Sequence, residues 1–416
     1  MSEERESATP KFLRDQYAII GVGETAYTRD SGRTTRHMAV EAVRNAMADC
    51  GIGPAEIDGM MSYQINDSTP STEVAGDLGI RLNHFQDVVG GGGSTEAMVG
   101  MAIGAMAAGM AKTFVLFRSM NGATGRRMGG SGAGGGRRVG PGSLFGPIYG
   151  SVSPAEMFSP AFMHHMYEYG TTPEQVAHIK MYHSWGASNN PKAYYSKRVS
   201  VEEVLASRVI CYPLHLLDCC VETDNATCII LTSVERAYDY RHTPARILSV
   251  VGKCSKPRMD MHYQCGPLSR VAGFYGKDIL WRNAGLGPED VDITGSYDAF
   301  TFTTMLQLED YGFCEKGEGG HYVSDGTIAL GGRRPNNTAG GHLCEGYTHG
   351  MNMVIENVRQ LRGDVDDYCP IGADGRRQHT FDYSEGGCRQ VRDAEVAANL
   401  GWSTVNTGSA LVMRKG

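Results

Sequence analysis

The sequence has no apolar run long enough to cross a membrane. The apolar stretch at residues 97–111 is shorter than the ~20 residues that a membrane-spanning helix needs, and we expect it to form a buried helix. A stripe of basic residues is also missing, and the formal net charge of the 416 residues is -7. Because nucleic-acid binding depends on clustered Lys and Arg, we expect neither a nucleic acid nor a membrane as a partner.

Signatures of nucleotide, metal and disulfide sites are missing as well. No glycine-rich stretch continues into Gly-Lys-Ser or Gly-Lys-Thr, which excludes a P-loop. The histidines and cysteines do not form a metal-binding quartet, so we expect no metal site. The eleven cysteines include no Cys-x-x-Cys pair, and no export signal precedes them. We therefore expect reduced thiols and a cytoplasmic location.

The sequence does contain an internal repeat. The segment at 50–58, Cys-Gly-Ile-Gly-Pro-Ala-Glu-Ile-Asp, returns at 284–292 as Ala-Gly-Leu-Gly-Pro-Glu-Asp-Val-Asp. In each copy a helix-patterned run, at 38–48 or 278–283, ends at a glycine, and a proline and acidic residues precede a strand. Self-similarity at so long a period predicts two related structural halves.

A glycine-rich loop follows each copy of the repeat. Residues 90–94, Gly-Gly-Gly-Gly-Ser, precede the small-residue helix of the first half, and residues 336–341, Asn-Asn-Thr-Ala-Gly-Gly, precede a helical run in the second. Such a loop lets the backbone approach a ligand closely, and the helix after it presents free N–H groups. Alternating helices and strands predict an α/β fold with parallel or mixed sheets covered by helices.

Six short stretches, taken in order, resemble one known family. They are Tyr-Ala-Ile-Ile-Gly-Val-Gly-Glu-Thr at 17–25, the four glycines at 90–93, Asn-Asn-Pro-Lys-Ala at 189–193, Pro-Leu-His-Leu-Leu-Asp-Cys-Cys at 213–220, Ser-Tyr-Asp-Ala-Phe at 296–300 and Gly-Gly-His-Leu-Cys-Glu-Gly-Tyr at 340–347. Together they resemble the thiolase superfamily, and within it the sterol-carrier or lipid-transfer branch, over nearly the whole chain.

The resemblance implies an α/β thiolase fold, in which two pseudo-symmetric halves form five αβαβα layers and one half carries an inserted loop domain. We expect the first half at 1–118 and 208–240, the insert at 119–207 and the second half at 241–416. The first part of the insert is rich in glycine, with twelve glycines from Asn121 to Gly150. Its later part predicts helices at 172–185, with a Thr-Pro-Glu start, and at 201–207.

The departures from the family point to the chemistry. The resemblance matches the family's nucleophilic Cys to Gly93, its Gly-His-Pro histidine to Tyr347, and a second polar catalytic residue to Tyr297. The family's second Cys is absent from the closing strand that we expect from Trp402 to Met413. Covalent acyl transfer needs an activated nucleophile, so these replacements argue against Claisen condensation.

Enolate chemistry survives the loss of the thiol. Cleaving a β-hydroxyacyl-CoA by a retro-aldol reaction needs a base, an oxyanion site and a proton donor to carbon. Tyrosines at both positions resemble the lipid-transfer-type aldolases of bacterial sterol side-chain breakdown, which implies a 17-hydroxy steroid-CoA cleaved to a 17-ketosteroid and propionyl-CoA. We assign Tyr347 as base and Tyr297 as donor, and the two roles could be exchanged. A phenol is a poor base at pH 7, so this assignment requires a group that favours phenolate.

Other residues near these motifs are candidates for supporting roles. The amides of Gly92, Gly93 and Ser94 are our candidates for the oxyanion site, because they precede a helix. Four residues beside the tyrosines could orient them from behind: Asp298, His342, Glu345 and His349. Four arginines in the glycine-rich insert could meet CoA phosphates or belong to a solvated loop: Arg126, Arg127, Arg137 and Arg138.

Two alternatives to a retro-aldolase stay open. An acyltransferase would use Ser94 or Cys344 as its nucleophile, and a carrier would keep the fold for binding acyl-CoA or lipid without catalysis. No cofactor is expected, because CoA is part of the substrate. The resemblance also implies a homodimer and a zinc-ribbon and OB-fold acyl-CoA-binding partner, which together form a heterotetramer.

Overall fold

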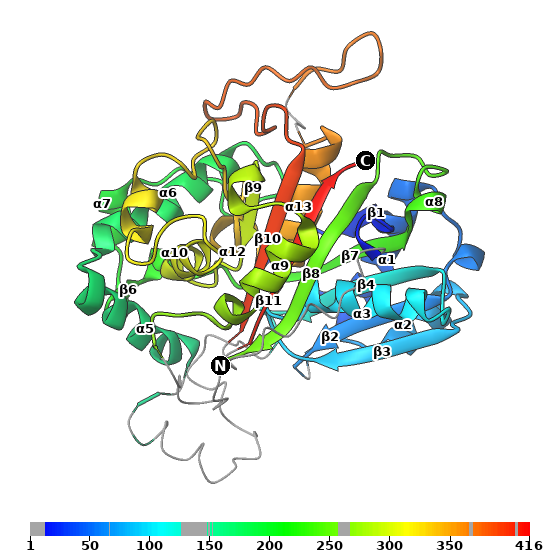
Figure 1. Cartoon of the computed structure of the whole chain (residues 1–416), viewed down its shortest axis with the longest axis horizontal. Coiled ribbons are helices and arrows are strands. Elements are labelled where there is room, and N and C mark those ends of the chain that lie inside the picture. Colours follow the sequence, from blue (N-terminus) through cyan, green and yellow to red (C-terminus); the bar gives the residue numbers. More distant parts are fainter. Residues whose placement is uncertain are drawn as a thin grey trace.

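The computed structural model describes residues 13–65, 67–125, 148, 150–151, 153–256, 267–365, 369–403 and 407–416 (Figure 1). Its strands are β1 (Tyr17–Glu24), β2 (Gly59–Gln64), β3 (His84–Val89), β4 (Thr113–Asn121), β5 (Val209–Cys211), β6 (Leu214–His215), β7 (Asp224–Ser233), β8 (Ala245–Ser255), β9 (Ile293–Ser296), β10 (Val396–Ser403) and β11 (Thr407–Lys415). Its α-helices are α1 (Thr35–Cys50), α2 (Ser71–Leu78), α3 (Thr95–Ala107), α5 (Pro154–Tyr169), α6 (Pro173–Ser188), α7 (Val201–Ala206), α8 (Val234–Ala237), α9 (Lys277–Ala284), α10 (Thr301–Asp310), α11 (Gly319–Ser324), α12 (Gly341–Cys344) and α13 (Met351–Arg362).

The sequence repeat is a repeat of structure. α1 ends at Gly51 and α9 at Gly285, and both glycines have the left-handed conformation, with φ of 79° and 70°. A 3₁₀ turn follows each of them, Pro54–Glu56 in the first copy and Pro288–Asp290 in the second. In each turn the last acidic side chain accepts a hydrogen bond from the preceding glycine amide, which holds the turn that leads into β2 or β9.

The two halves share a nine-stranded sheet, in the order β3-β2-β4-β7-β1-β8-β11-β10-β9. Its halves join only where Ala18 and Ile19 of β1 pair with Arg246 and Ala245 of β8. Strands β2, β4, β7 and β1 correspond in order to β9, β10, β11 and β8. The counterpart of β3 is reduced to a single bridge between Thr294 and Asn336.

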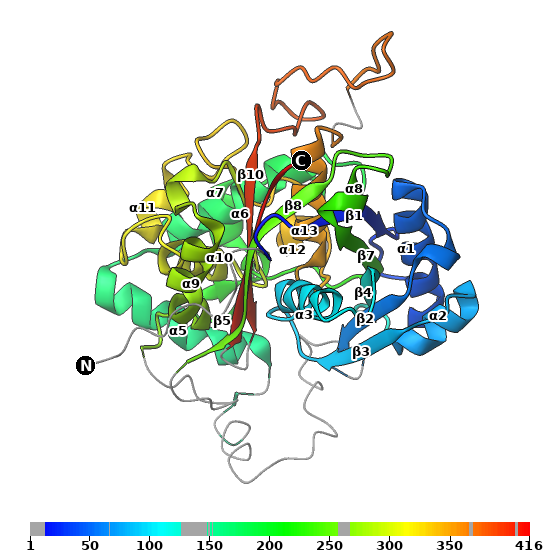
Figure 2. The same cartoon turned by 45° about the vertical axis from the view of Figure 1, so that its right-hand side comes forward.

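Five layers follow one another across the molecule, as the resemblance implies (Figure 2). Helices α1 and α2 cover the outer face of the first half-sheet, and α3 and α13 lie between the two half-sheets. Helices α5, α6, α9 and α10 cover the outer face of the second half-sheet. The predicted αβαβα arrangement is therefore confirmed.

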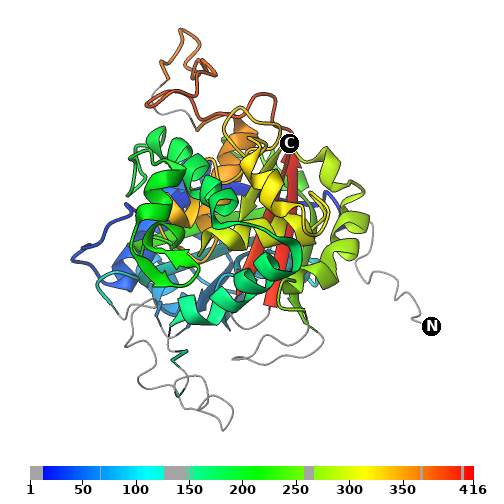
Figure 3. The same cartoon turned by 90° about the vertical axis from the view of Figure 1, so that its left-hand side faces the viewer.

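The later part of the insert is helical and lies over the second half (Figure 3). The predicted helices correspond to α6 and α7, and α6 begins after Thr172, whose side chain accepts a hydrogen bond from the Gln175 amide. Helix α6 packs on α10, α11 and α12. The expected boundaries of the three regions stay a prediction, because the start of the insert lies largely outside the described residues.

One local expectation was wrong, and one helix was not predicted. The segment expected as one closing strand from Trp402 to Met413 belongs to two antiparallel strands, in which Trp402 of β10 pairs with Gly408 of β11. Helix α5 was not expected, although Ser153 and Glu156 form a capping box at its start and Pro154 occupies its first turn. Among the described residues, no helix is both long and apolar enough to cross a membrane.

Candidate active site

A cavity of about 430 Å³ lies where the insert, the first glycine-rich loop and the second half meet. Tyr297 and Tyr347 form part of its wall, together with Gly91, Gly92 and His349. Much of the remaining wall is apolar and comes from Pro154, Ala155, Phe158, Ile210, Leu216, Leu217, Val221, Ala299 and Phe300. The volume falls within the range of about 300–1,000 Å³ that is common for small-molecule sites.

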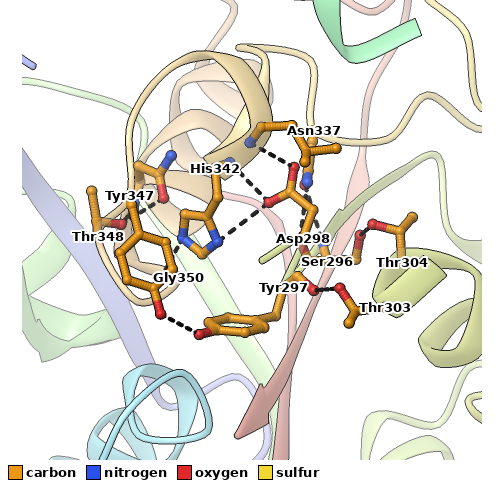
Figure 4. Close-up of polar contacts among 12 residues, drawn as sticks. Ser296, Tyr297, Asp298, Thr303, Thr304, Asn337, His342, Tyr347, Thr348 and Gly350 are labelled. Atoms are coloured by element: carbon orange, nitrogen blue, oxygen red, sulfur yellow. Dashed lines mark hydrogen bonds and ion pairs between the residues drawn. The ribbon is translucent and has the colours of Figure 1, made fainter. Parts of the chain in front are cut away.

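The two tyrosine hydroxyls are in direct contact. Their oxygens lie 2.6 Å apart, and either hydroxyl could be the donor (Figure 4). The two residues are 5% and 7% exposed, so both are largely buried behind the cavity wall. The structure therefore brings together the two residues that the sequence nominated for proton transfer.

Backbone contacts fix Tyr297 at the end of β9. Its amide donates to the Leu400 carbonyl of β10, at 2.9 Å. Its carbonyl accepts hydrogen bonds from Thr303 Oγ1 and Gln307 Nε2 of α10, at 2.7 and 2.8 Å. The residue thus stands at the junction of a buried strand and a buried helix, which fixes its backbone.

Tyr347 lies on the loop between α12 and α13 and is held from the first half. Its amide donates to Thr223 Oγ1, and its carbonyl accepts a hydrogen bond from Asn225 Nδ2 of β7, at 3.1 and 2.9 Å. The rings of His342 and His349 lie 4.8 Å from its ring, both in edge contact. Tyr347 is therefore enclosed by groups from both halves of the fold.

The surroundings of the two phenols disfavour their ionised forms. Burial raises the pKa of Tyr297 and of Tyr347 well above the ordinary value for tyrosine. The hydrogen bond from Tyr347 opposes this effect at Tyr297 without overcoming it. The phenolate-favouring environment that the sequence-based assignment requires is absent from the described residues, so both tyrosines are neutral near pH 7.

Gly92, and not Gly93, faces the tyrosine pair. A Cβ added at Gly92 would lie 1.9 Å from Tyr297 Cε2, whereas one at Gly93 would meet Thr407 Oγ1 at 3.2 Å. The cavity wall includes Gly92, while Gly93 and Ser94 do not contribute to it. A side chain at 92 would therefore collide with the Tyr297 ring. The match of the family's nucleophilic Cys to Gly93 stays a prediction.

The predicted oxyanion loop contributes fewer donors than expected. The Ser94 amide donates to the Gly91 carbonyl at 2.9 Å, which makes it unavailable to a ligand. The Ser94 hydroxyl is fully buried and does not reach the cavity. Of the three residues predicted to form the oxyanion site, only Gly92 lies at the cavity wall.

Asp298 anchors the segment that carries Tyr347. Its carboxylate accepts hydrogen bonds from the His342 amide at 2.8 Å and from His183 Nδ1 at 2.9 Å. Burial disfavours its ionised form, but the His183 hydrogen bond and the nearby His342 hold the pKa of Asp298 below its ordinary value. As Figure 4 shows, the carboxylate points toward His342 and away from the Tyr297 hydroxyl.

His342 is a neutral spacer between this carboxylate and Tyr347. Its Nε2 accepts the Gly350 amide hydrogen at 3.0 Å, and its Nδ1 lies 3.3 Å from Asp298 Oδ1. Burial lowers the pKa of His342 to about 4. Glu345 lies farther from the cavity, and Asn190 and Asn352 each donate a hydrogen bond to its carboxylate at 2.8 Å. Burial and the neighbouring carboxylates raise the pKa of Glu345 to about 8.

The thiols are poor nucleophiles. Cys344 is fully buried outside the cavity wall, with its sulfur 3.3 Å from Lys180 Nζ. Cys219 and Cys220 do line the cavity, but burial raises the pKa of Cys219 to about 12 and that of Cys220 well above the ordinary value. A protonated thiol does not attack a thioester readily, which disfavours a cysteine acyl-enzyme.

Sequence reasoning missed two basic residues at the site. Lys180 of α6 lines the cavity although it is only 1% exposed. Arg118 is fully buried in β4 and contacts His349. A signal for Arg118 was present, because an arginine within the apolar stretch Phe-Val-Leu-Phe-Arg at 114–118 needs a buried partner.

Some expectations concern residues outside the described part of the chain, and others stay open. Arg126, Arg127, Arg137 and Arg138 fall outside the described residues, so their proposed role in binding CoA phosphates stays a prediction. Within the described ranges, no group of three His, Cys, Asp or Glu side chains could hold a metal ion. The expectations of no metal and no cofactor also remain predictions.

Comparisons with known proteins show what the whole chain is similar to. Residues 278–373 match the family described as "Thiolase C-terminal domain-like". The chain is 38% identical over 360 residues to a 17-hydroxy-3-oxo-4-pregnene-20-carboxyl-CoA lyase of Mycobacterium tuberculosis, covering 85% of this chain and 93% of the relative. It is 36% identical over 356 residues to a steroid side-chain-cleaving aldolase of Thermomonospora curvata, covering 83% and 90%. A solved structure described as "Ltp2-ChsH2(DUF35) aldolase" superposes with a TM-score of 0.85 at 32% identity, covering 97% and 98%.

Proposed function

Because this chain belongs to the thiolase superfamily, in the lipid-transfer branch that includes the steroid side-chain-cleaving aldolases, we propose that it is a retro-aldolase. Its substrate would be a 17-hydroxy steroid C20-carboxyl-CoA, and its products a 17-ketosteroid and propionyl-CoA. The observation that carries the proposal is the contact of two phenol hydroxyls, 2.6 Å apart, at the wall of a largely apolar cavity. Gly92, which lies against this pair, has no side chain that could act as a nucleophile.

The hydroxyl contact supports a proton relay that never needs a free phenolate. The substrate hydroxyl gives its proton to Tyr347, Tyr347 passes its own proton to Tyr297, and Tyr297 delivers one to C20. These transfers occur in one concerted step, in which the C17–C20 bond breaks, its electrons shift toward the thioester while the proton from Tyr297 is delivered to C20, and the C17–O bond becomes a carbonyl. No net charge is gained by the pair, which agrees with the raised pKa of both phenols. If Tyr297 and Tyr347 exchange roles in the relay, the balance of protons and charge is the same.

The cavity wall suits a rigid hydrocarbon next to the reacting atoms. Phe158, Phe300 and Leu216 supply apolar surface, and a steroid nucleus against them would be removed from water. Two exposed arginines at the cavity, Arg29 and Arg208, lie on the solvent side, where the anionic CoA part would emerge. The acyl group therefore belongs inside and the CoA group outside.

We also propose that the active form is a heterocomplex with a DUF35-type acyl-CoA-binding protein. Support comes from the solved aldolase with which the chain superposes, whose description names such a component. The homodimer core and the heterotetramer remain part of this proposal, as does the cytoplasmic location. Co-purification with the partner, followed by mass photometry, would measure the stoichiometry.

The decisive test is cleavage of 17-hydroxy-3-oxo-4-pregnene-20-carboxyl-CoA by the chain with its DUF35 partner. We expect propionyl-CoA and the 17-ketosteroid in equal amounts, and a loss of at least 10²-fold in kcat for Tyr297→Phe and for Tyr347→Phe. Tyr311→Phe is the matched control, because it removes another buried hydroxyl, which donates to the Ser409 carbonyl away from the cavity.

Three outcomes would contradict the proposal. Full activity of both cavity variants would remove the tyrosine relay. An acyl adduct on the intact protein, seen by mass spectrometry, would favour the acyltransferase. No cleavage by a folded complex that binds the steroid-CoA tightly would favour a carrier.

A further inference from the structure

His349 lies at the cavity wall in a conformation that its neighbours must impose. Its backbone has φ of 62°, in the left-handed region that residues other than glycine rarely adopt. Such a strained conformation persists only where surrounding contacts hold it. The side chain is 1% exposed and lines the cavity beside Gly91 and Tyr347.

Arg118 fixes which nitrogen of His349 carries the proton. Its Nε and one terminal nitrogen lie 3.2 and 3.1 Å from His349 Nδ1. Arg118 is itself held by Asp67 at 2.6 Å and by the Ser119 carbonyl at 2.8 Å. A guanidinium can only donate, so Nδ1 must be the acceptor. In a neutral ring the hydrogen then resides on Nε2.

The protonation state of the ring agrees with this tautomer. Burial and the positive charge of Arg118 lower the pKa of His349 to about 3. The ring is therefore neutral at any pH at which the protein would work, and its single N–H is on Nε2. No proton transfer is needed to prepare this donor.

The Nε2–H group faces the cavity near the first glycine-rich loop. A Cβ built on Gly91 would lie 3.6 Å from His349 Nε2, with both residues in the cavity wall. No described residue accepts a hydrogen bond from Nε2, and this atom is not among the fully enclosed, unpaired ones. His342, by contrast, has its Nε2 occupied by the Gly350 amide and does not line the cavity.

We propose that His349 is a further catalytic residue, whose Nε2–H donates a hydrogen bond to the thioester oxygen of the acyl-CoA and stabilises the enolate. This inference rests on the retro-aldol function proposed above. In the expected oxyanion site, the His349 Nε2–H group takes the place of the Ser94 amide, which already donates to the Gly91 carbonyl. The edge contact between the His349 and Tyr347 rings, at 4.8 Å, places the donor next to the proton relay.

The electron flow gives this donor a defined task. When the C17–C20 bond breaks, its electron pair moves through C20 to the thioester oxygen, where Nε2–H meets the negative charge. Tyr297 protonates C20 in the same concerted step, so the negative charge on the thioester oxygen is partial and is greatest in the transition state. A preorganised donor at such an oxygen contributes about 10²–10³-fold in rate, and the buried Arg118 behind the ring strengthens its polarity.

Two substitutions at the same position separate the donor from the shape of the ring. His349→Phe keeps a flat ring and loses the N–H, whereas His349→Gln keeps an N–H donor at about the distance of Nε2. Both bear the same backbone strain, so the difference between them measures the donor. We expect kcat to fall about 10²–10³-fold for the Phe variant and to stay within about tenfold of wild type for the Gln variant, with smaller changes in KM.

A kcat for His349→Phe within threefold of wild type would overturn the inference. A Gln variant as slow as the Phe variant would also overturn it, provided that circular dichroism shows both to be folded. Either result would leave the tyrosine relay and the proposed function untouched.

A spectroscopic test does not depend on turnover. The infrared band of propionyl-CoA labelled with ¹³C at its carbonyl is recorded bound to wild type, His349→Phe and His349→Gln. We expect a shift to lower frequency in wild type and the Gln variant, and none in the Phe variant. An unshifted band in wild type, or the same shift in all three, would refute the hydrogen bond. If wild type cleaves no steroid-CoA, the proposed function fails while this band still decides the role of His349.

Discussion

Replacing Gly92 by alanine should disable the tyrosine pair through a single methyl group. The added Cβ would lie 1.9 Å from Tyr297 Cε2 and 2.4 Å from both Tyr297 Cδ2 and the Trp402 carbonyl oxygen. Two of these atoms belong to the buried ring of Tyr297, which is in edge contact with the rings of His342 and Tyr347, and the third is a backbone atom. The conflict therefore cannot be relieved by turning a flexible side-chain end.

The required displacement follows from contact distances. Non-bonded carbons prefer about 3.5 Å, so the Tyr297 ring must retreat by about 1.6 Å from the 1.9 Å contact. Such a movement would break the 2.6 Å contact between the hydroxyls. A misplacement of about 1 Å costs about 10²-fold in rate, and overpacking of this kind costs about 1–3 kcal/mol of stability.

Gly93→Ala is the matched control for this prediction. Its Cβ would meet Thr407 atoms at 3.2–3.5 Å, and neither glycine has a positive φ, so backbone strain does not enter the comparison. The assay is steroid-CoA cleavage at saturating substrate, with thermal unfolding of both variants. We expect kcat of Gly92→Ala to fall at least 10²-fold below that of Gly93→Ala. Equal rates in the two variants would refute the view that Tyr297 has no room to move.

Two further predictions concern protons. Between about pH 5.5 and 7.5 we expect log kcat to be flat, because burial raises the pKa of Tyr297 and Tyr347 above this window and lowers that of His349 to about 3; a slope of one would show that phenolate is the active form. Burial also raises the pKa of Glu96 from 4.5 to about 7. The protonated side chain therefore contributes to folding stability below pH 4.5, and this contribution is lost as the pH rises through 7. Glu96→Gln, which can keep the hydrogen bond with Ser409, should therefore gain stability over wild type by on the order of 3 kcal/mol at pH 8, seen as a difference in Tm that disappears near pH 4.5; a pH-independent difference would refute it.

The fold was predictable because its signals are local. A glycine in the left-handed conformation, a proline that starts a turn and an acidic cap recur at Gly51 and Gly285 with the same geometry, so the sequence repeat predicts the duplicated unit. The hairpin at 402–408 was missed for a physical reason. Residues 403–409, Ser-Thr-Val-Asn-Thr-Gly-Ser, are mostly polar and include turn-forming residues. Because Thr and Val also favour strands, this short stretch was interpreted as the continuation of one strand.

The site was predictable as a set of residues but not as a geometry. Tyr297 and Tyr347 could be named from their motifs, whereas their hydroxyl contact depends on anchors in α10, β10 and β7 that are distant in the sequence. The difference between Gly92 and Gly93 depends on which way one peptide unit faces in a loop of four glycines, and identical residues carry no such information. The buried contact between Arg118 and His349 joins β4 to the α12–α13 loop and has no local signal on the His349 side.

The contact between the phenols also changes the chemical argument that the sequence allowed. A single tyrosine acting as base must first lose its proton, and burial makes that loss harder. Two hydrogen-bonded tyrosines can instead accept and deliver a proton together, so burial becomes an advantage: it excludes water that would protonate the enolate at random. A fixed neutral donor such as His349 Nε2–H suits this scheme, because it stabilises negative charge on oxygen without supplying a mobile proton that would compete with Tyr297.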